Sequence, residues 1–244
     1  MTERGRGALA RDRSSLAIGP SALVWDGREL RAEIAEWTVP LPRRLRGEIR
    51  LRPEAIFERA HRLDAGPDGQ GDHLWWPIAP CARVEVEFEQ PALCWSGRAY
   101  LDSNRGSAPL EQAFLRWQWS RSTFANGSTA VVYDVAPRRG PGLCLARRFT
   151  TTGGSSDFEP PSPVGISPTF WRIDRAPPME GPIPASACRT FEDAPFYARS
   201  QLAGQLFGEA VETVHESLAL DRFRRRWVQT LLPFRMPRFP GGYR

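Results

Sequence analysis

The sequence has no lysine, since all 33 of its basic residues are arginines; with 28 acidic residues this gives a formal net charge of +5. The arginines are scattered through predicted strands and are not gathered on one helix, and no nucleic-acid-binding motif accompanies them. The basic composition therefore does not indicate a nucleic-acid partner. An arginine-rich surface still favours anionic lipid headgroups.

Residues that ligate metals are also scarce, with three histidines and four cysteines in 244 residues. They are His61, His73, His215, Cys81, Cys94, Cys144 and Cys188. Their spacing fits no metal site, so we expect no bound metal. No two cysteines form a CxxC pair, and we expect all four to be small buried residues in a reducing cytoplasm.

Several longer signatures are missing as well. The sequence has no G-x-S-x-G, no phosphate-binding loop and no dinucleotide fingerprint. We therefore expect no cofactor. No apolar run reaches the roughly 18 residues that a membrane span needs, so any membrane contact is expected to be peripheral.

The chain is rich in proline, with 23 residues, and 41% of its residues are hydrophobic. This composition is typical of strands and turns, and the length suffices for one large or two small domains. Glu89-Gln90-Pro91 marks a boundary, which predicts domains over residues 1–90 and 91–244. We expect both to be antiparallel β domains.

Alternating and β-branched segments predict the strands of each domain. In the first they are Ala22–Trp25, Glu29–Val39, Leu45–Arg52, His73–Ile78 and Ala82–Phe88. In the second they are Trp95–Asp102, Arg116–Arg121, Thr129–Val135, Leu143–Phe149, Thr169–Asp174, Cys188–Glu192, Phe196–Leu202 and Val211–Leu218. About eight antiparallel strands suffice for a small ligand-binding barrel. Thr151–Pro168 is expected to be a loop, and Leu220–Leu232 to be an amphipathic helix.

The stretch from Gly97 to Val135 concentrates the polar and aromatic residues of interest. In its first strand Tyr100 and Asp102 lie two residues apart and share a face. Asn126-Gly127 predicts a hairpin between the two strands that follow. Trp76, Trp117, Trp119 and Tyr133 are interpreted as packing residues. His215 and Glu216 are adjacent and fall on opposite faces, which argues against a catalytic pair.

Several of these segments resemble one family. GRAYLDSNRGSAPLEQAFLRWQWSR (from Gly97), HLWWPIAPCARVEVEFEQPALCW (from His73), TFEDAPFYARS, HESLALDRF and LPFRMPR are similar to the carotenoid 1,2-hydratases, also called hydroxyneurosporene synthases. The resemblance covers nearly the whole chain. It implies lipocalin-like β-barrel or sandwich domains with a C-terminal helix, and a cofactor-free hydratase acting on acyclic carotenoids such as lycopene or neurosporene.

The resemblance also implies site residues. Asp102, in the family's YxD motif, corresponds to the acid that protonates the terminal double bond. His73 and Trp75 form the HxW motif; the imidazole would orient or deprotonate water, and Trp75 with Tyr100 would face the cation. From residue type alone, Asp102 is equally interpretable as an Asp that caps a turn, and His73 as a hydrogen-bonded core residue.

Members of the family carry a further amino-terminal stretch. We therefore expect either a mis-assigned start at Met1 or a natural fragment, with an unpaired strand edge along Leu23–Val39.

Two functions remain open for this chain. The first is the hydratase. The alternative is a non-catalytic lipocalin-like protein that binds an isoprenoid or other lipid, or an inactive fragment of the hydratase. For the hydratase we expect a peripheral position on the cytoplasmic side of the inner membrane. The segment Leu220–Phe239 would either contact lipid through Phe223, Trp227, Leu231 and Phe234, or form a helix that packs against the outside of the barrel with its arginines solvated.

Overall fold

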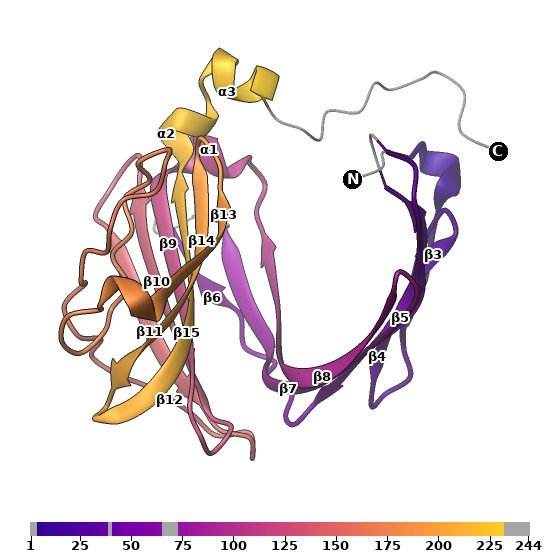
Figure 1. The fold of residues 1–244 in the computed structure, drawn as a ribbon, viewed down its shortest axis with the longest axis horizontal. Coiled ribbons are helices and arrows are strands. Elements are labelled where there is room, and N and C mark those ends of the chain that lie inside the picture. The colour runs from indigo at the N-terminus through magenta and orange to yellow at the C-terminus, as the bar shows by residue number, and fades with distance from the viewer. Residues whose placement is uncertain (1–3, 39–40, 65–72, 232–244) are drawn as a thin grey trace. The chain divides into compact units, whose positions relative to one another are not determined.

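The computed structural model describes residues 4–38, 41–64 and 73–231, which are mostly antiparallel β-strand (Figure 1). They form two compact units that alternate along the chain. The first unit holds residues 4–54 and 82–100, and the second holds residues 55–81 and 101–231. The predicted all-β class is confirmed. The predicted domain division at residue 90 stays a prediction.

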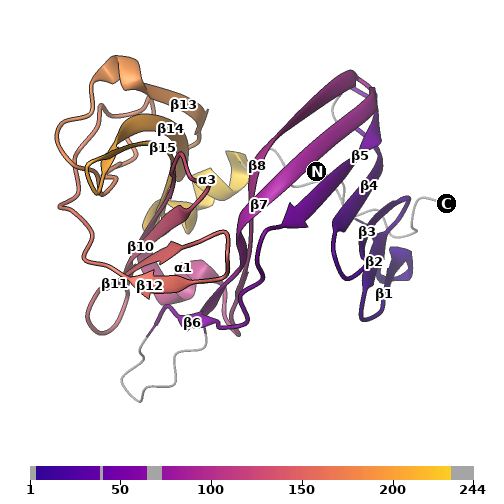
Figure 2. The ribbon, with the colours of Figure 1, turned by 90° about the horizontal axis from the view of Figure 1, so that it is seen from below.

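The first unit is a meander in which consecutive strands pair in sequence order (Figure 2). Its strands are β1 (Leu9–Arg11), β2 (Ser15–Ile18), β3 (Ser21–Trp25), β4 (Leu30–Trp37) and β5 (Arg44–Pro53), preceded by the 3-10 turn η1 (Arg6–Ala8). The hairpin between β3 and β4 is as predicted. Gly27 adopts φ 97°, a value that glycine tolerates, and Asp26 accepts the backbone N–H groups of Arg28 and Glu29.

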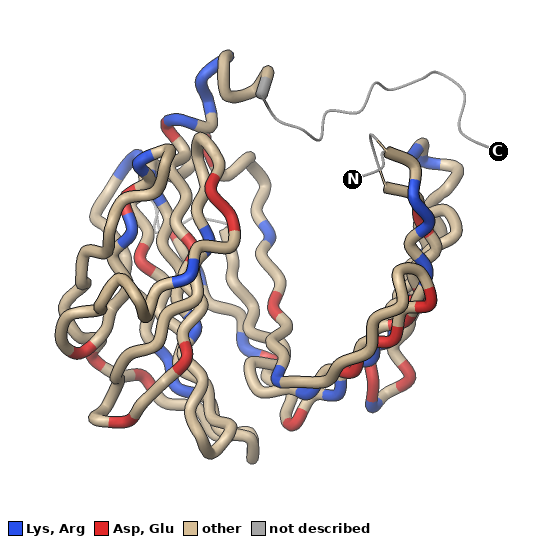
Figure 3. The backbone as a smooth tube through the Cα atoms, in the orientation of Figure 1, with Lys and Arg blue, Asp and Glu red and all other residues tan. Residues whose placement is uncertain are grey.

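The expected unpaired edge at Leu23–Val39 is wrong for its described part. β3 pairs with β2 and β4, and β4 pairs with β3 and β5. The reason is that the polar first residues form β1 and β2 and so cover this edge. Acidic and basic positions are interspersed along β4 and β5 (Figure 3), where Arg52 bonds Glu29 at 2.7 Å and Glu85 at 2.8 Å.

β7 (Leu74–Gln90) is one strand of 17 residues, where the sequence predicted two. Its start pairs with β6 (His61–Arg62), and its part from Ala82 onward pairs with β5. Pro77 and Pro80 fall between these two paired segments, so their missing N–H groups interrupt neither ladder. β8 (Ala92–Arg105) follows and pairs with β7. Both strands contribute to both units.

The second unit is built on a seven-stranded sheet in the order β12-β11-β10-β9-β15-β14-β13. Its strands are β9 (Phe114–Thr123), β10 (Thr129–Pro137), β11 (Leu143–Phe149), β12 (Ser155–Asp157), β13 (Cys188–Asp193), β14 (Tyr197–Leu206) and β15 (Glu209–Ala219). Within the described chain β12 and β13 end this order without pairing with each other, so a closed barrel is not formed. The sandwich form of the fold prediction is the one that fits.

Two predictions inside this unit are wrong. β12 lies in the segment predicted to be a loop. Thr169–Asp174 forms no strand, because Arg172 adopts φ 51° and turns the chain, while Ile173 and Arg175 become buried.

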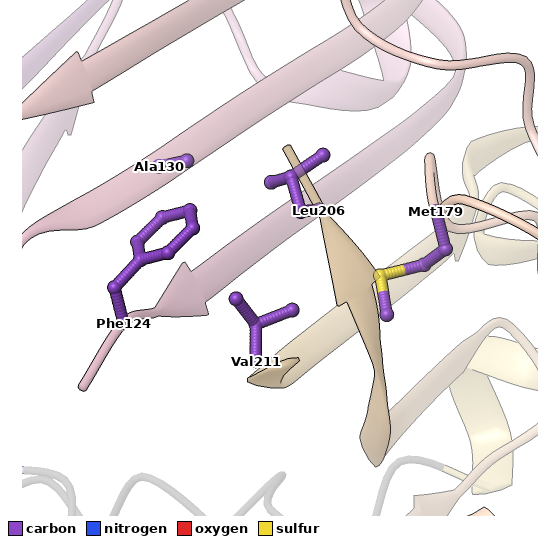
Figure 4. Close-up of a cluster of buried hydrophobic side chains, with 5 residues drawn as sticks. All are labelled: Phe124, Ala130, Met179, Leu206 and Val211. Atoms are coloured by element: carbon purple, nitrogen blue, oxygen red, sulfur yellow. The ribbon is translucent and has the colours of Figure 1, made fainter. Parts of the chain in front are cut away.

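One face of the seven-stranded sheet carries an apolar cluster of Phe124, Ala130, Met179, Leu206 and Val211 (Figure 4). Beside it lies a buried polar layer. In this layer His215 is held by Ser120 at 2.8 Å and by Ser217 at 3.0 Å, and Arg175 donates to Ser200 at 2.7 Å. Buried polar groups are tolerated when hydrogen-bonded, as these are. The opposite face carries the candidate site.

Short helical segments complete the second unit: α1 (Leu110–Ala113), η2 (Ala185–Ala187), α2 (Leu220–Phe223) and α3 (Arg226–Leu231). The single helix predicted over Leu220–Leu232 is therefore two, with a break at Arg224 and Arg225. Leu220 and Val228 are the buried residues, and Phe223 packs on Phe196 at 4.8 Å. Phe234 and Phe239 of the proposed lipid-contacting segment lie outside the described residues.

The cysteines are free, but they are not uniformly buried. Cys81 is buried and Cys188 is partly buried, whereas Cys94 and Cys144 are exposed. The expectation of four buried cysteines is thus wrong for Cys94 and Cys144. Both lie in strands: Cys94 lies in the part of β8 where successive residues are exposed, and Cys144 lies in β11.

Candidate functional site

The candidate site lies in the second unit and centres on Asp102 and Trp75. Asp102 is near the end of β8 and is partly buried, and Trp75 is in the neighbouring strand β7 and is fully buried. The indole Nε1 of Trp75 donates a hydrogen bond of 3.0 Å to Oδ2 of Asp102. The structure thus brings together the Asp of the YxD motif and the Trp of the HxW motif.

Aromatic rings surround this pair. Tyr133 lies with its ring centroid 5.0 Å from that of Trp75, and it also contacts Trp117 at 5.0 Å and Trp119 at 6.5 Å. Phe149 meets Trp75 edge-on at 6.3 Å. Trp117, Trp119 and Tyr133 are all buried, as the packing interpretation predicted. Together with Trp75 they form an aromatic wall whose rings pack through edge-on and tilted contacts.

Tyr133 has a perturbed hydroxyl. Burial raises its pKa well above the usual value of a phenol, and the negative charge of Asp102 acts in the same direction. Its hydroxyl donates to Oδ1 of Asn104 at 3.2 Å. Tyr133 is therefore neutral at physiological pH, and its interaction with Asp102 shows that the carboxyl group is close to the aromatic wall.

His73 precedes β7, and both of its ring nitrogens are occupied. Nδ1 lies 2.8 Å from Oδ2 of Asp64, and Nε2 lies 2.9 Å from the carbonyl oxygen of Ala108. Each ring nitrogen thus lies against an oxygen that accepts hydrogen bonds. The residue is 4% exposed and packs on Phe114 at 5.1 Å. A Cβ at Gly106 would overlap this ring, so the loop after β8 closes tightly on His73.

This geometry is that of a hydrogen-bonded core histidine, which ties the start of β7 to the loop after β8. The predicted role of His73 in activating water stays a prediction.

Tyr100 lies two residues before Asp102 in β8, shares its strand face and is partly buried. Its predicted role also stays a prediction. Trp76 is 38% exposed and donates to the carbonyl of Phe57 at 2.6 Å, so it packs at the rim of the fold.

Glu216 is a residue that the sequence argument set aside. It lies opposite Trp119, which in turn lies opposite Tyr133, so these three residues form a row across β15, β9 and β10 on the face of the site. Burial raises the pKa of Glu216, and the charges of Asp102 and Glu192 add to this effect. Arg199, 3.4 Å away, acts in the opposite direction. His215 points to the other face, as predicted.

The site therefore offers one carboxyl group held by an indole N–H, a second carboxyl group within electrostatic reach, and a wall of aromatic rings. Within residues 4–38, 41–64 and 73–231, no group of three or more His, Cys, Asp or Glu side chains is arranged to hold a metal ion. Such a site can donate a proton in apolar surroundings and stabilise the cation that results.

Fold and site together define an all-β protein in which a carboxyl group is set against aromatic rings. The family model of the carotenoid hydratase CrtC matches residues 1–242, and the chain belongs to this family.

Its relatives include acyclic carotenoid 1,2-hydratases. That of Thiocapsa roseopersicina is 50% identical over 99% of this chain, and that of Rubrivivax gelatinosus is 46% identical over 98%. The hydratase of Cereibacter sphaeroides is 35% identical over 99%. The chain spans 58% of the length of the first two relatives and 85% of the third. No solved structure matches the chain.

Proposed function

We propose that this chain carries out the hydration of the terminal 1,2 double bond of acyclic carotenoids such as lycopene and neurosporene, as a hydro-lyase with Asp102 as its acid. The observation that carries the proposal is the hydrogen bond from Trp75 to Asp102 inside the aromatic wall. The names of the relatives support the substrate class.

The reaction begins with proton transfer from the neutral carboxyl of Asp102 to C2 of the alkene. The π-electrons form the new C–H bond, and C1 becomes a tertiary cation. Water then attacks C1, and the proton it releases returns to the Asp102 carboxylate. The product is a tertiary 1-hydroxy carotenoid, and the acid is regenerated.

The residues around Asp102 suit these steps. Trp75 donates to Oδ2 and so fixes the orientation of the carboxyl group that carries the proton. The rings of Trp75 and Tyr133, and Tyr100 on the same strand face as Asp102, would stabilise the cation, by roughly 0.5 to 2 kcal/mol for each ring when water is excluded. His73, held by Asp64 and Ala108, would fix the start of β7 and the loop after β8, and so position Trp75 and Asp102.

The test is Asp102→Asn in the full-length protein. The amide accepts the same bond from Trp75 and has nearly the same shape, but it cannot protonate carbon. Hydration of lycopene, followed by chromatography, should fall at least a hundredfold, while the cooperative thermal transition is kept. Turnover above a few per cent of wild type would remove Asp102 from the acid role. Tight carotenoid binding by a wild type that lacks turnover would identify a lipid-binding protein instead.

A substrate dissolved in lipid requires contact with a membrane, and we propose that this contact is peripheral, on the cytoplasmic side of the inner membrane. Among the described residues, no helix is both long enough and apolar enough to cross a bilayer. Phe170 is 84% exposed and contacts Trp171, which lies 6.1 Å from the half-exposed Trp227. Exposed arginines at positions 224–226 adjoin this aromatic set. Aromatic rings beside arginines suit an anionic lipid surface.

A further inference from the structure

A row of polar side chains crosses the face of the seven-stranded sheet opposite to the candidate site. Its members, directly opposed across β9, β15, β14 and β13, are Ser120, His215, Ser200 and Thr190. Directly opposed residues on antiparallel strands share a face, with Cβ atoms about 5 Å apart. Ser120, His215 and Ser200 are buried, so the row is a polar layer inside the unit.

Arg175 brings a positive charge into this layer, and its side chain is only 4% exposed. Its Nη1 donates to Ser200 at 2.7 Å and to Thr190 at 2.9 Å, and lies 3.9 Å from Sγ of Cys188. Its Nη2 donates to the carbonyl oxygen of Ser167. None of these partners in the described chain is a carboxylate. Arginine is protonated at every physiological pH, so they leave a buried charge without an opposite charge.

The layer also holds more hydrogen-bond donors than acceptors. Nε of Arg175 is buried and forms no hydrogen bond to the residues that the structure describes. The hydroxyl of Ser200 accepts from Arg175, which leaves its own O–H to donate. Burial and the charge of Arg175 lower the pKa of His215 to about 3, so its imidazole is neutral and has one N–H. It lies between Ser120 and Ser217, at 2.8 and 3.0 Å, so one of these serines accepts from it and keeps an O–H to donate.

The backbone on both sides of Arg175 holds its guanidinium over the row. The N–H of Ile166 donates to the carbonyl oxygen of Arg175 at 3.2 Å, and the N–H of Ala176 donates to Oε1 of Gln118 at 3.0 Å. Gln118 is itself buried, in β9. The charge and the surplus donors are therefore fixed in the same place.

We propose that this polar layer binds a small monovalent anion of about the size of chloride. Arg175 supplies the charge and its Nε–H, and Ser200 supplies a second donor. An anion accepts hydrogen bonds and donates none, so it matches both the charge and the surplus donors of the layer. Because Arg175 and Ser200 are almost completely enclosed by protein, a compact anion suits them better than a phosphate. The inference is independent of the proposed function, since the layer lies on the sheet face opposite to Trp119 and Tyr133.

Asp193 is the alternative counter-ion. It lies in β13 opposite Ala198, two residues from Ser200, and so shares the face of the layer. Its Oδ2 accepts the N–H of Trp171 at 3.4 Å, and its Oδ1 is buried and forms no hydrogen bond within the described chain. The experiment must therefore distinguish a bound anion from this carboxylate.

The experiment replaces gluconate by chloride at constant ionic strength. In the wild-type protein the ¹H–¹⁵N signal of Arg175 Nε should shift saturably, and the Tm should rise along the same curve. Phosphate should change neither. Arg175→Met should abolish the rise in Tm. Ser200→Ala, a smaller change that keeps the charge, should raise the chloride concentration at half saturation by about tenfold, as expected for loss of a hydrogen bond to an anion.

The matched control is Ser122→Ala. Ser122 is a buried serine on the same face of β9, but its hydroxyl is paired with Thr213 at 2.7 Å, and Thr213 donates onward to Met179. This variant should keep the wild-type half-saturation concentration within about twofold. Three results would overturn the inference: no saturable response in the folded wild type, an equal response to phosphate, or a chloride response found only in Asp193→Asn. The last result would identify Asp193 as the counter-ion.

Discussion

The indole N–H of Trp75 and Oδ2 of Asp102, 27 positions apart in the sequence, are joined by a hydrogen bond of 3.0 Å. The bond links the HxW and YxD motifs through the pairing of β7 with β8. It fixes the orientation of the carboxyl group of one motif against the indole of the other. The two motifs thus form one hydrogen-bonded unit.

Trp75→Phe tests this unit. It keeps an aromatic ring but removes the N–H donor and part of the buried volume. We expect a loss of about 1–3 kcal/mol in unfolding free energy. Turnover should fall by about tenfold or more, because the bond becomes charge-assisted as Asp102 gives up its proton, and such a bond contributes roughly 1.5–3 kcal/mol. Denaturant titration and steady-state rates measure the two effects.

The neighbouring tryptophan provides the control. Trp76→Phe also removes one indole N–H, which bonds the carbonyl of Phe57, but its side chain is 38% exposed. It should change turnover by less than about twofold, because its indole lies outside the aromatic wall. Equal losses of turnover in the two variants would show that the indole bond to Asp102 has no special role.

Local signals in the sequence predicted much of the fold. The strand over Leu143–Phe149 has the predicted bounds, because glycine and proline precede it and two glycines follow shortly after it. The turn at Asn126-Gly127 is also as predicted: Gly127 adopts φ 88°, and Asn126 accepts the N–H of Ser128. Such features depend on neighbours within a few residues.

The failures have nonlocal causes. Thr169–Asp174 alternates like a strand, yet it forms none. Arg175, the next residue, instead donates hydrogen bonds to Ser200 and Thr190 on the face of the sheet. Glu216 was correctly placed on the face opposite to His215. The sequence held no signal that Glu216 shares this face with Trp119 and Tyr133, because that arrangement depends on the register of β15 against β9 and β10.

His215 leads to a prediction about acid stability. Burial, with the nearby charge of Arg175, lowers its pKa to about 3. The unfolded chain takes up a proton near pH 6.5, and the folded chain does so only near pH 3, so the unfolded state binds more protons between these values. Stability is therefore full above pH 6.5 and declines as the pH falls toward 3, by about 1.4 kcal/mol for each pH unit.

His215→Asn removes this titration. The variant is expected to be less stable than wild type at pH 7, because it leaves Ser120 or Ser217 without its partner. Its unfolding free energy should nevertheless fall less steeply between pH 6 and pH 4. His61, whose pKa burial lowers to about 4, contributes to the slope that both proteins share. Identical slopes in urea titrations of the two proteins would contradict the assignment of His215 as a buried neutral residue.

Membrane docking is tested by changing the surface around Phe170 and Trp227. Arg222 is left intact, because it donates to the carbonyl oxygens of Trp171 and Arg172 and so supports the aromatic set. Arg224, Arg225 and Arg226, which are exposed, are changed together to Gln. Each arginine near an anionic surface contributes about 1 kcal/mol, so binding to phosphatidylserine vesicles should weaken more than tenfold and become less sensitive to salt.

Two further variants distinguish the effect of net charge on vesicle binding from the effect of the surface around Phe170. Phe170→Ser removes the most exposed aromatic ring and should weaken vesicle binding while the salt dependence stays as in wild type. Changing the exposed residues Arg105, Arg139 and Arg189 to Gln lowers the net charge by the same three units at other sites, and binding should change little. All variants should keep the wild-type Tm within a few degrees. If the two triple variants bind vesicles equally, attraction depends on net charge alone, and the surface around Phe170 is not the docking site.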